Sequence, residues 1–184
     1  GGMGGGGMGG GSALLSQPSM SGCYSHRVTR NWIMYNRTSS QARAGGEASH
    51  AGFLLGLGLL GHLTLTATDT CEYLIQGHEP TTIAVLLGTA ASHVSSADPL
   101  LSKTLSLHLP ALLPPQHWDI DISPLVQAAA LVSLGLLHCG SGHRLMSELL
   151  LAEIGRCPEG DRCEGREAMV LAAAWALGMV LLGR

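Results

Sequence analysis

The sequence predicts an all-α protein built as a solenoid of helical hairpins, and two observations lead to this fold class. A Leu-Gly core recurs four times, at Gly58, Gly88, Gly135 and Gly178, with intervals of roughly 30 to 47 positions that are typical of helical hairpin repeats. Each copy belongs to a run of about ten to fifteen apolar and small residues, which is long enough for three or four helical turns. A polar break and a second, amphipathic run follow the first three copies, so the repeating unit is a two-helix hairpin.

The first fifty residues differ from the rest of the chain. Residues 1–11 read GGMGGGGMGGG and cannot bury enough apolar surface to offset the entropy of ordering them, so we expect them to be disordered. Residues 12–50 are rich in Ser, Gly, Arg and Asn, with one apolar cluster, Trp32–Tyr35, which we expect to lie extended along a neighbouring surface. We therefore divide the chain into a low-complexity and extended segment, 1–50, and a repeat region, 51–184.

The first two hairpins are predicted from their helix start and stop signals. The first covers Ala51–Ile75, and the polar stretch Thr66–Asp69 is a plausible cap for its second helix. The second covers Thr81–Leu109, with a helix start at Ser96–Pro99. The proline-rich connection LPALLPPQHWDIDISP then ends this unit and lengthens the interval to the next one.

The third hairpin is the clearest, and it is followed by half of a fourth. Pro124–Gly155 contains two apolar runs, Leu125–His138 and His143–Ile154, which are separated by a Gly-Ser-Gly turn. The last copy has only its first helix, Arg166–Leu182. The repeat region therefore holds about three and a half units, and we expect it to be truncated from a longer protein.

The glycines of the first helices predict close helix packing. Glycine inside a helix costs roughly 0.5 to 1 kcal/mol relative to alanine, so Gly52, Gly56 and Gly58 in one helix require compensation. Aromatic residues make up only 4% of the chain, so close contact through small residues must supply the packing that large rings usually provide. We expect an inner layer of first helices, with the second helices outside it.

The stretch FLLGLGLLGHL offers an alternative, because Gly56, Gly58 and Gly61 match the G-x-G-x-x-G spacing of a dinucleotide-binding loop. Such a loop needs a strand before it and an acidic residue about 20 positions on. Three residues at most precede it as a strand, and the Leu-Gly core recurs four times, whereas a nucleotide loop occurs once per site. The pattern favours a repeat over a nucleotide-dependent oxidoreductase.

Composition argues against nucleic-acid and membrane partners. Ten basic and thirteen acidic residues give a formal net charge of -3, which provides no basic surface for nucleic acid. The longest uncharged apolar run, Ala168–Gly183, is shorter than the roughly 20 residues that span a bilayer, so it is more typical of a buried helix. The five cysteines are widely spaced and odd in number, which favours free thiols in a reducing compartment.

His138, Cys139 and His143 lie close together at a predicted helix end and are the candidate metal ligands. A closed zinc site needs four ligands, and no C-x-x-C pair supplies the others. Cys157 and Cys163 are separated by five residues, an unusual spacing for a zinc knuckle. The pattern favours turn-proximal polar residues and a small buried thiol over a metal site.

Two further patterns resemble catalytic groups. Ser141 is flanked directly by Gly140 and Gly142, whereas a hydrolase nucleophile stands in G-x-S-x-G between a strand and a helix. Asp119 and Asp121 are two positions apart, with nothing that marks a cleft around them. We expect a hairpin turn and a solvated loop, and no catalytic, cofactor-binding or metal site in the chain.

The blocks of sequence also resemble a known family. LVSLGLLHCGSGHRLMSELLLAEIG resembles a proteasome/cyclosome repeat, in which a small-residue helix ending in Leu-Gly-Leu, a glycine-rich turn and a leucine-rich helix alternate. NWIMYNR, AGFLLGLGLLGHL, QGHEPTTIAVLLG, LSLHLPALLPP and SELLLAEIGR are similar, in order and spacing, to the repeat region of the subunit 1 family of the anaphase-promoting complex. The resemblance covers roughly Asn31–Arg184, and the glycine-rich start and Arg156–Gly165 depart from it.

The resemblance implies a closed or nearly closed toroid of proteasome/cyclosome-type repeats. It implies a non-catalytic scaffold, found in nucleus and cytoplasm, of a multi-subunit ubiquitin ligase that controls the metaphase-anaphase transition. The implied partners are the cullin and RING, tetratricopeptide and platform subunits, together with the coactivator and the substrate-receptor subunit. A repeat scaffold of the proteasome regulatory particle is the alternative, because its large non-ATPase subunits share the repeat.

Overall fold

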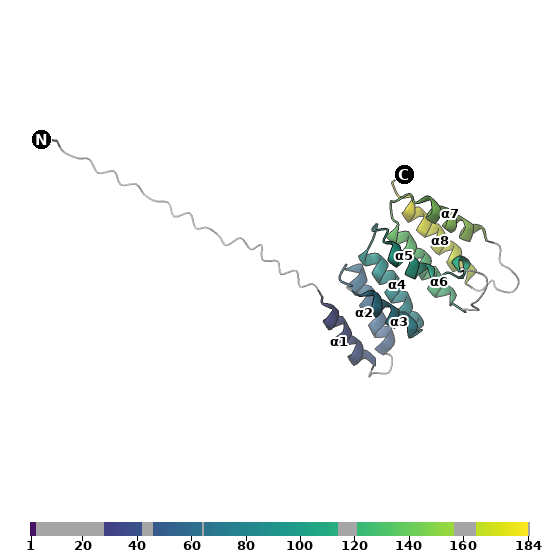
Figure 1. Ribbon diagram of the computed structural model, residues 1–184, viewed down its shortest axis with the longest axis horizontal. Helices are drawn as coiled ribbons and strands as arrows, with labels where there is room; N and C mark the ends of the chain where they lie inside the picture. Colours follow the sequence, from purple (N-terminus) through teal and green to yellow (C-terminus); the bar gives the residue numbers. More distant parts are fainter. Residues whose placement is uncertain (3–27, 42–45, 64, 114–120, 157–164, 184) are drawn as a thin grey trace.

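A computed structural model describes residues 1–2, 28–41, 46–63, 65–113, 121–156 and 165–183. Within these ranges the chain forms eight α-helices and one short 3-10 turn, with no strand. Figure 1 shows the helices gathered into one array, with α1 at one end and α7 and α8 at the other. The predicted all-α fold of helical hairpins is confirmed.

The structure corrects the prediction for the N-terminal segment. Trp32–Tyr35 is not extended, because it lies in helix α1 (Arg30–Gln41), and α2 (Gly46–Leu59) begins before residue 51. Ile33 of α1 is completely buried against the first hairpin. This burial stabilises a helix that the local sequence does not predict. Residues 3–11, most of the tract expected to be disordered, lie outside the described residues.

The first two hairpins form as predicted from their caps. Helix α3 (Ala67–Ile75) begins with a capping box, in which Thr66 and Asp69 each accept a hydrogen bond from the other's main-chain N–H. In the second hairpin, α4 (Glu79–Ser92) is followed by α5 (Pro99–Ser106). The Asp98 carboxylate caps α5 by accepting from two main-chain N–H groups, and a proline occupies the first helical turn.

The remaining helices also agree with the predicted bounds within a few residues. The short 3-10 turn η1 (Pro110–Leu112) opens the long connection, of which residues 114–120 lie outside the described part of the chain. The third hairpin consists of α6 (Pro124–Leu137) and α7 (Arg144–Gly155). Helix α8 (Arg166–Val180) is the single helix of the fourth unit.

The helices form two layers. Helices α2, α4, α6 and α8, which we call the first-helix layer, contact one another in succession. In the second layer, α3 packs on α4, α5 on α6 and α7 on α8, so each second helix contacts the first helix of the following unit. The predicted inner layer of first helices is confirmed, and each hairpin is tied to the next through both of its helices.

Main-chain hydrogen bonds from the turns repeat this connection. After α4, the N–H groups of Ser95 and Ala97 donate to the carbonyls of Leu136 and Leu137, at 3.1 and 3.0 Å, and so cap the C-terminus of α6. The turn after α6 caps α8 in the same way: the N–H groups of Gly140 and Gly142 donate to Met179 and Val180, both at 2.9 Å. Each turn therefore satisfies helix-end carbonyls of the next unit.

The donors in both turns have a left-handed backbone. Gly140 and Gly142 have φ of 68° and 59°, which glycine adopts without strain. Ser95 and Ala97 occupy the equivalent places with φ of 61° and 50°, although side chains disfavour this region. The repeated hydrogen-bond pattern, rather than the local sequence, holds the second hairpin's turn in this conformation.

Candidate functional site

Two glycines of the Leu-Gly core lie at close main-chain contacts in the first-helix layer. A Cβ atom on Gly58 would lie 2.2 Å from the Gly88 Cα, which is closer than two non-bonded carbon atoms can pack. A Cβ atom on Gly135 would lie 2.6 Å from the Ala176 Cα of α8. Glycine at these two positions therefore allows main chain to meet main chain, and the predicted close approach is confirmed there.

Not every glycine of the pattern has this role. A Cβ atom added to Gly52 or Gly56 of α2, or to Gly178 of α8, would have nothing within 4 Å of it. The expectation that all three glycines of α2 are compensated by close helix packing is therefore wrong for Gly52 and Gly56. Their helix cost is offset instead by the contacts that the other residues of α2 make.

Two arginines bind α1 to α3 through ion pairs that we call the α1 clamp. Arg30 donates two hydrogen bonds to the buried Asp69 carboxylate, each at 2.6 Å, and Asp69 Oδ2 also accepts from Thr66. Arg30, with a smaller effect from Thr66, holds the pKa of Asp69 well below its usual range. Arg37, two turns further along the helix, lies over the ring of Tyr73 at 4.7 Å and pairs with Glu72 at 2.9 Å.

A buried polar pair lies beneath these arginines. His50 and Tyr73 hydrogen bond at 2.9 Å between the imidazole Nε2 and the phenol oxygen. Burial lowers the pKa of His50, and the nearby Arg37 charge lowers it further, so this imidazole is neutral near pH 7. Burial likewise raises the pKa of Tyr73. The pair therefore joins α2 to α3 as a neutral hydrogen bond.

A second set of ion pairs, which we call the α7–α8 clamp, joins α7 to α8. No local sequence pattern predicts it. Glu153, whose side chain is 8% exposed, accepts from Arg156 at 3.1 Å and from Arg166 at 3.2 Å. Arg166 also donates to the main-chain carbonyls of Glu153, Ile154 and Arg156 at the end of α7. One side chain of α8 thus satisfies the last carbonyls of the preceding helix.

Among the described residues, the candidate metal ligands are not grouped with a further ligand as a metal site would require. His138 is buried at the end of α6, its ring contacts that of His143 at 5.2 Å, and Cys139 beside it is half-buried. His143 instead caps α7, where its Nδ1 accepts from the Met146 N–H. Among the described residues, no three His, Cys, Asp or Glu side chains are grouped as metal ligands.

Cys157 and Cys163 lie outside the described residues, so the spacing of this pair stays untested.

Burial, with a smaller effect from His143, lowers the pKa of His138. The His138 Nδ1 is buried without a hydrogen-bond partner in the described part of the chain. This imidazole is a neutral core residue at a helix junction.

The other catalytic patterns also have structural roles. Ser141 Oγ donates to the His138 carbonyl at 2.6 Å and accepts from the His143 N–H at 3.2 Å, so it shapes the hairpin turn. Asp121 is exposed before α6, and Asp119 lies outside the described residues. Gly56 and Gly58 lie inside helix α2 rather than in a loop after a strand, which contradicts the dinucleotide-loop geometry.

Several large apolar side chains remain exposed on the helices. Leu171 and Trp175 of α8 are each 69% exposed, and Leu59 and Leu60 at the end of α2 are 69% and 71% exposed. No described helix is both long and apolar enough to cross a membrane. A stacked array of helical hairpins, joined from one unit to the next by polar contacts, defines a helical-repeat protein.

Comparison with known proteins identifies the family within this class. The model for the "APC1 fourth domain" matches residues 12–94, and the model for the "APC1 fifth domain" matches residues 99–184. The chain belongs to the anaphase-promoting complex subunit 1 family. The boundary between the two matches falls in the turn between α4 and α5, inside the repeat array.

Curated relatives come from distant eukaryotes. Anaphase-promoting complex subunit 1 of Homo sapiens is 47% identical over 160 residues, which are 85% of this chain and 8% of the human protein. The Arabidopsis thaliana subunit 1 is 42% identical over 159 residues, covering 86% of this chain and 9% of that protein. "Negative regulator of mitosis" of Emericella nidulans is 38% identical over 166 residues, covering 85% and 8%. The chain thus spans less than a tenth of the length of these relatives.

Proposed function

We propose that this chain is a non-catalytic scaffold region of the anaphase-promoting complex, the ubiquitin ligase of the metaphase-anaphase transition. The observation that carries the proposal is the family match over both halves of the chain, joined to a fold made of stacked hairpins. The same match favours this complex over the proteasome regulatory particle. Residues 51–184 would supply repeats of the scaffold's helical array.

The packing supports a scaffold function because it links each unit to the next. Main-chain contact at Gly58 and Gly135, the turn hydrogen bonds and the Arg166 clamp all cross from one hairpin to its neighbour. In such arrays stability is approximately the sum of unit stabilities and nearest-neighbour interfaces. A continuous array of this kind can hold partner subunits at fixed separation.

The surface supports a place inside a larger assembly. Leu171, Trp175, Leu59 and Leu60 are exposed large apolar side chains, and such faces mark contact with other protein surfaces. We propose that the assembly includes the cullin and RING, tetratricopeptide and platform subunits, with the coactivator and substrate-receptor subunit. We also propose that it acts in nucleus and cytoplasm, and that ubiquitin transfer is carried out by the other subunits.

The experiment is purification of the tagged endogenous full-length protein from mitotic cells, followed by quantitative mass spectrometry. Recovery of cullin, RING and tetratricopeptide subunits in fixed ratio to the tagged chain supports the proposal. Recovery of proteasomal ATPases in fixed ratio, or of the tagged chain alone, contradicts it. A non-catalytic role is tested separately by measuring ubiquitin transfer by the isolated chain with ubiquitin-activating and -conjugating enzymes, where we expect no transfer.

A further inference from the structure

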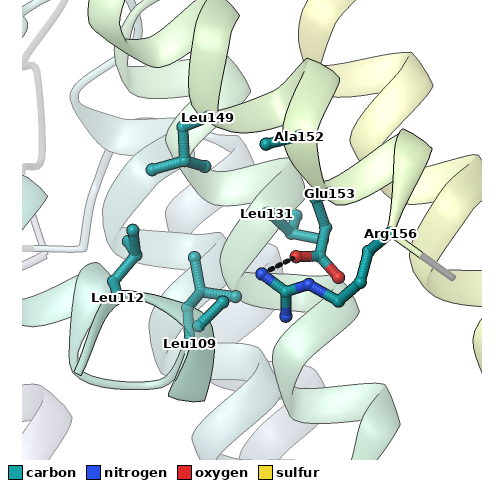
Figure 2. Close-up of a pocket in the computed structure, with 8 residues that line it drawn as sticks. Leu109, Leu112, Leu131, Leu149, Ala152, Glu153 and Arg156 are labelled. Carbon is teal, nitrogen blue, oxygen red and sulfur yellow. Dashed lines mark ion pairs between the residues drawn. The ribbon is translucent and has the colours of Figure 1, made fainter. Parts of the chain in front are cut away.

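An open apolar pocket of about 170 Å³ lies on the second-helix side of the array. Leu109 and Leu112, beside and within η1, face Leu149 and Ala152 of α7 across the opening, as Figure 2 shows. Leu131 of α6 closes the back of the pocket and is 1% exposed. The hollow is therefore built by three separate elements of the fold and does not depend on one flexible loop.

Charge is concentrated at one end of this pocket. Glu153 and Arg156 both line it, and their ion pair is drawn in Figure 2. The two carboxylate oxygens of Glu153 are already engaged, one by Arg156 and the other by Arg166. Two guanidinium groups thus face one carboxylate, and the side chain of Arg156 is 49% exposed. Glu153 is only 8% exposed, so among the described lining residues the charge that reaches solvent beside the apolar interior is the guanidinium of Arg156.

We propose that this pocket binds a short segment of a partner protein in which leucine or isoleucine stands next to aspartate or glutamate. The volume suits one side chain, because cavities of about 150 Å³ hold a molecule of the size of benzene. The aliphatic side chain enters between Leu112 and Leu149, and the neighbouring carboxylate reaches the exposed edge of Arg156. Apolar burial supplies affinity, and the charge sets which neighbour is accepted.

This occupant follows from both halves of the site. A peptide with lysine beside the leucine would place a positive charge near Arg156, which is unfavourable. A peptide with an acidic residue alone would leave the apolar walls in contact with water. The inference is independent of the proposed scaffold function, since it rests on the pocket and its charges alone.

The test uses purified full-length protein and a photoreactive probe, acetyl-Gly-Ser-photoleucine-Glu-Ser-Gly-amide. After illumination, we expect adducts on Leu112, Leu149 or Ala152, mapped by peptide mass spectrometry. An excess of the same peptide with ordinary leucine should remove them. A second probe with lysine in place of glutamate should label these residues less, by about fivefold, the factor that corresponds to the upper range of an exposed ion pair.

Variants separate the pocket from non-specific labelling. Ala152 is exposed, so Ala152→Phe fills the pocket from the solvent side and should abolish labelling without removing a core contact. Arg156→Glu should reverse the preference between the two probes, and Arg156→Lys should retain it. Leu151→Ala, on the same helix but outside the pocket, is the matched control and should label like the unaltered protein. Absent or displaced adducts, or equal labelling of Ala152→Phe, would overturn the proposal.

Discussion

The contact between α2 and α4 can be tested by adding one methyl group at two neighbouring positions. Gly58→Ala places a Cβ atom 2.2 Å from the Gly88 Cα, whereas Gly56→Ala, half a turn earlier in the same helix, places one where nothing lies within 4 Å. Carbon atoms pack favourably at about 3.5 to 4.0 Å, so in the first variant the two main chains must move apart by about 1 Å or more. In the second they need not move.

The magnitudes follow from two opposing effects. Replacing a helical glycine with alanine stabilises a helix by roughly 0.5 to 1 kcal/mol, and both variants gain this amount. Overpacking costs typically 1 to 3 kcal/mol, and main-chain contact on both sides places Gly58→Ala at the upper end, about 3 kcal/mol. We expect Gly58→Ala to lose about 2 kcal/mol of unfolding free energy and Gly56→Ala to gain about 0.5 to 1 kcal/mol.

The assay is urea unfolding of the 184-residue chain, followed by far-ultraviolet circular dichroism. The difference between the two variants isolates the overpacking, because the change in helix propensity is the same in both. If the two midpoints move together in either direction, the first helices do not meet at Gly58, and the stacked layer is wrong. Gly58→Ser should behave like Gly58→Ala or worse, since it adds a larger side chain.

Three further predictions address the turns, the α1 clamp and the buried histidines. Ala97→Gly relieves left-handed backbone strain and should raise the unfolding free energy by up to about 1 kcal/mol. Gly142→Ala introduces the same strain and should lower it by about 1 to 2 kcal/mol. Urea unfolding measures both changes. Asp69→Asn should detach α1, so hydrogen exchange of α1 amides should rise sharply while those of α6 stay protected. Because burial lowers the pKa of His50 and His138 below the value of about 6.5 in an unfolded chain, the unfolded state binds more protons below that pH. Stability should therefore fall as pH drops from about 7 towards 5, and His138→Gln should flatten that dependence in denaturation curves.

The acid side of the same linkage involves Asp69. Its pKa is held well below that of an unfolded aspartate, so its stabilising effect is complete above about pH 4 and is lost as pH falls further. The loss should begin at α1, because Arg30 is the main cause of the shift. Asp69→Asn should remove this acid-induced step. An unchanged step in that variant would mean that other carboxylates cause it.

The hairpin bounds could be predicted because their signals are local. The Thr66 cap, the Asp98-Pro99 start and the Gly-Ser-Gly turn each lie within a few residues of the helix end that they fix. The apolar runs between such signals bury their surface against the neighbouring units. These local signals and apolar runs are therefore sufficient to predict an array of helical hairpins.

The parts that sequence did not predict depend on contacts between distant residues. Helix α1 is held by Arg30 to Asp69, which are 39 positions apart, and no local pattern distinguishes Arg30 from the other arginines of that segment. The α7–α8 clamp likewise joins Arg166 to Glu153, which are 13 positions apart. Gly56 and Gly58 are equally plausible contact residues in the sequence, and only the rotation of α2 against α4 selects Gly58. Packing between distant parts of the chain determines which of these residues make the contact.

The most direct test of the proposed scaffold function disrupts the contact between stacked first helices and measures which subunits are still recovered with the protein. Tagged full-length protein carrying Gly135→Leu, which places a side chain against the α8 main chain, is purified from mitotic cells beside Gly52→Leu, whose added Cβ atom meets open space. We expect Gly135→Leu to lose cullin, RING and tetratricopeptide subunits from the recovered material, and Gly52→Leu to retain them in fixed ratio. Equal recovery with both variants would contradict the claim that the stacked first-helix layer holds the complex together.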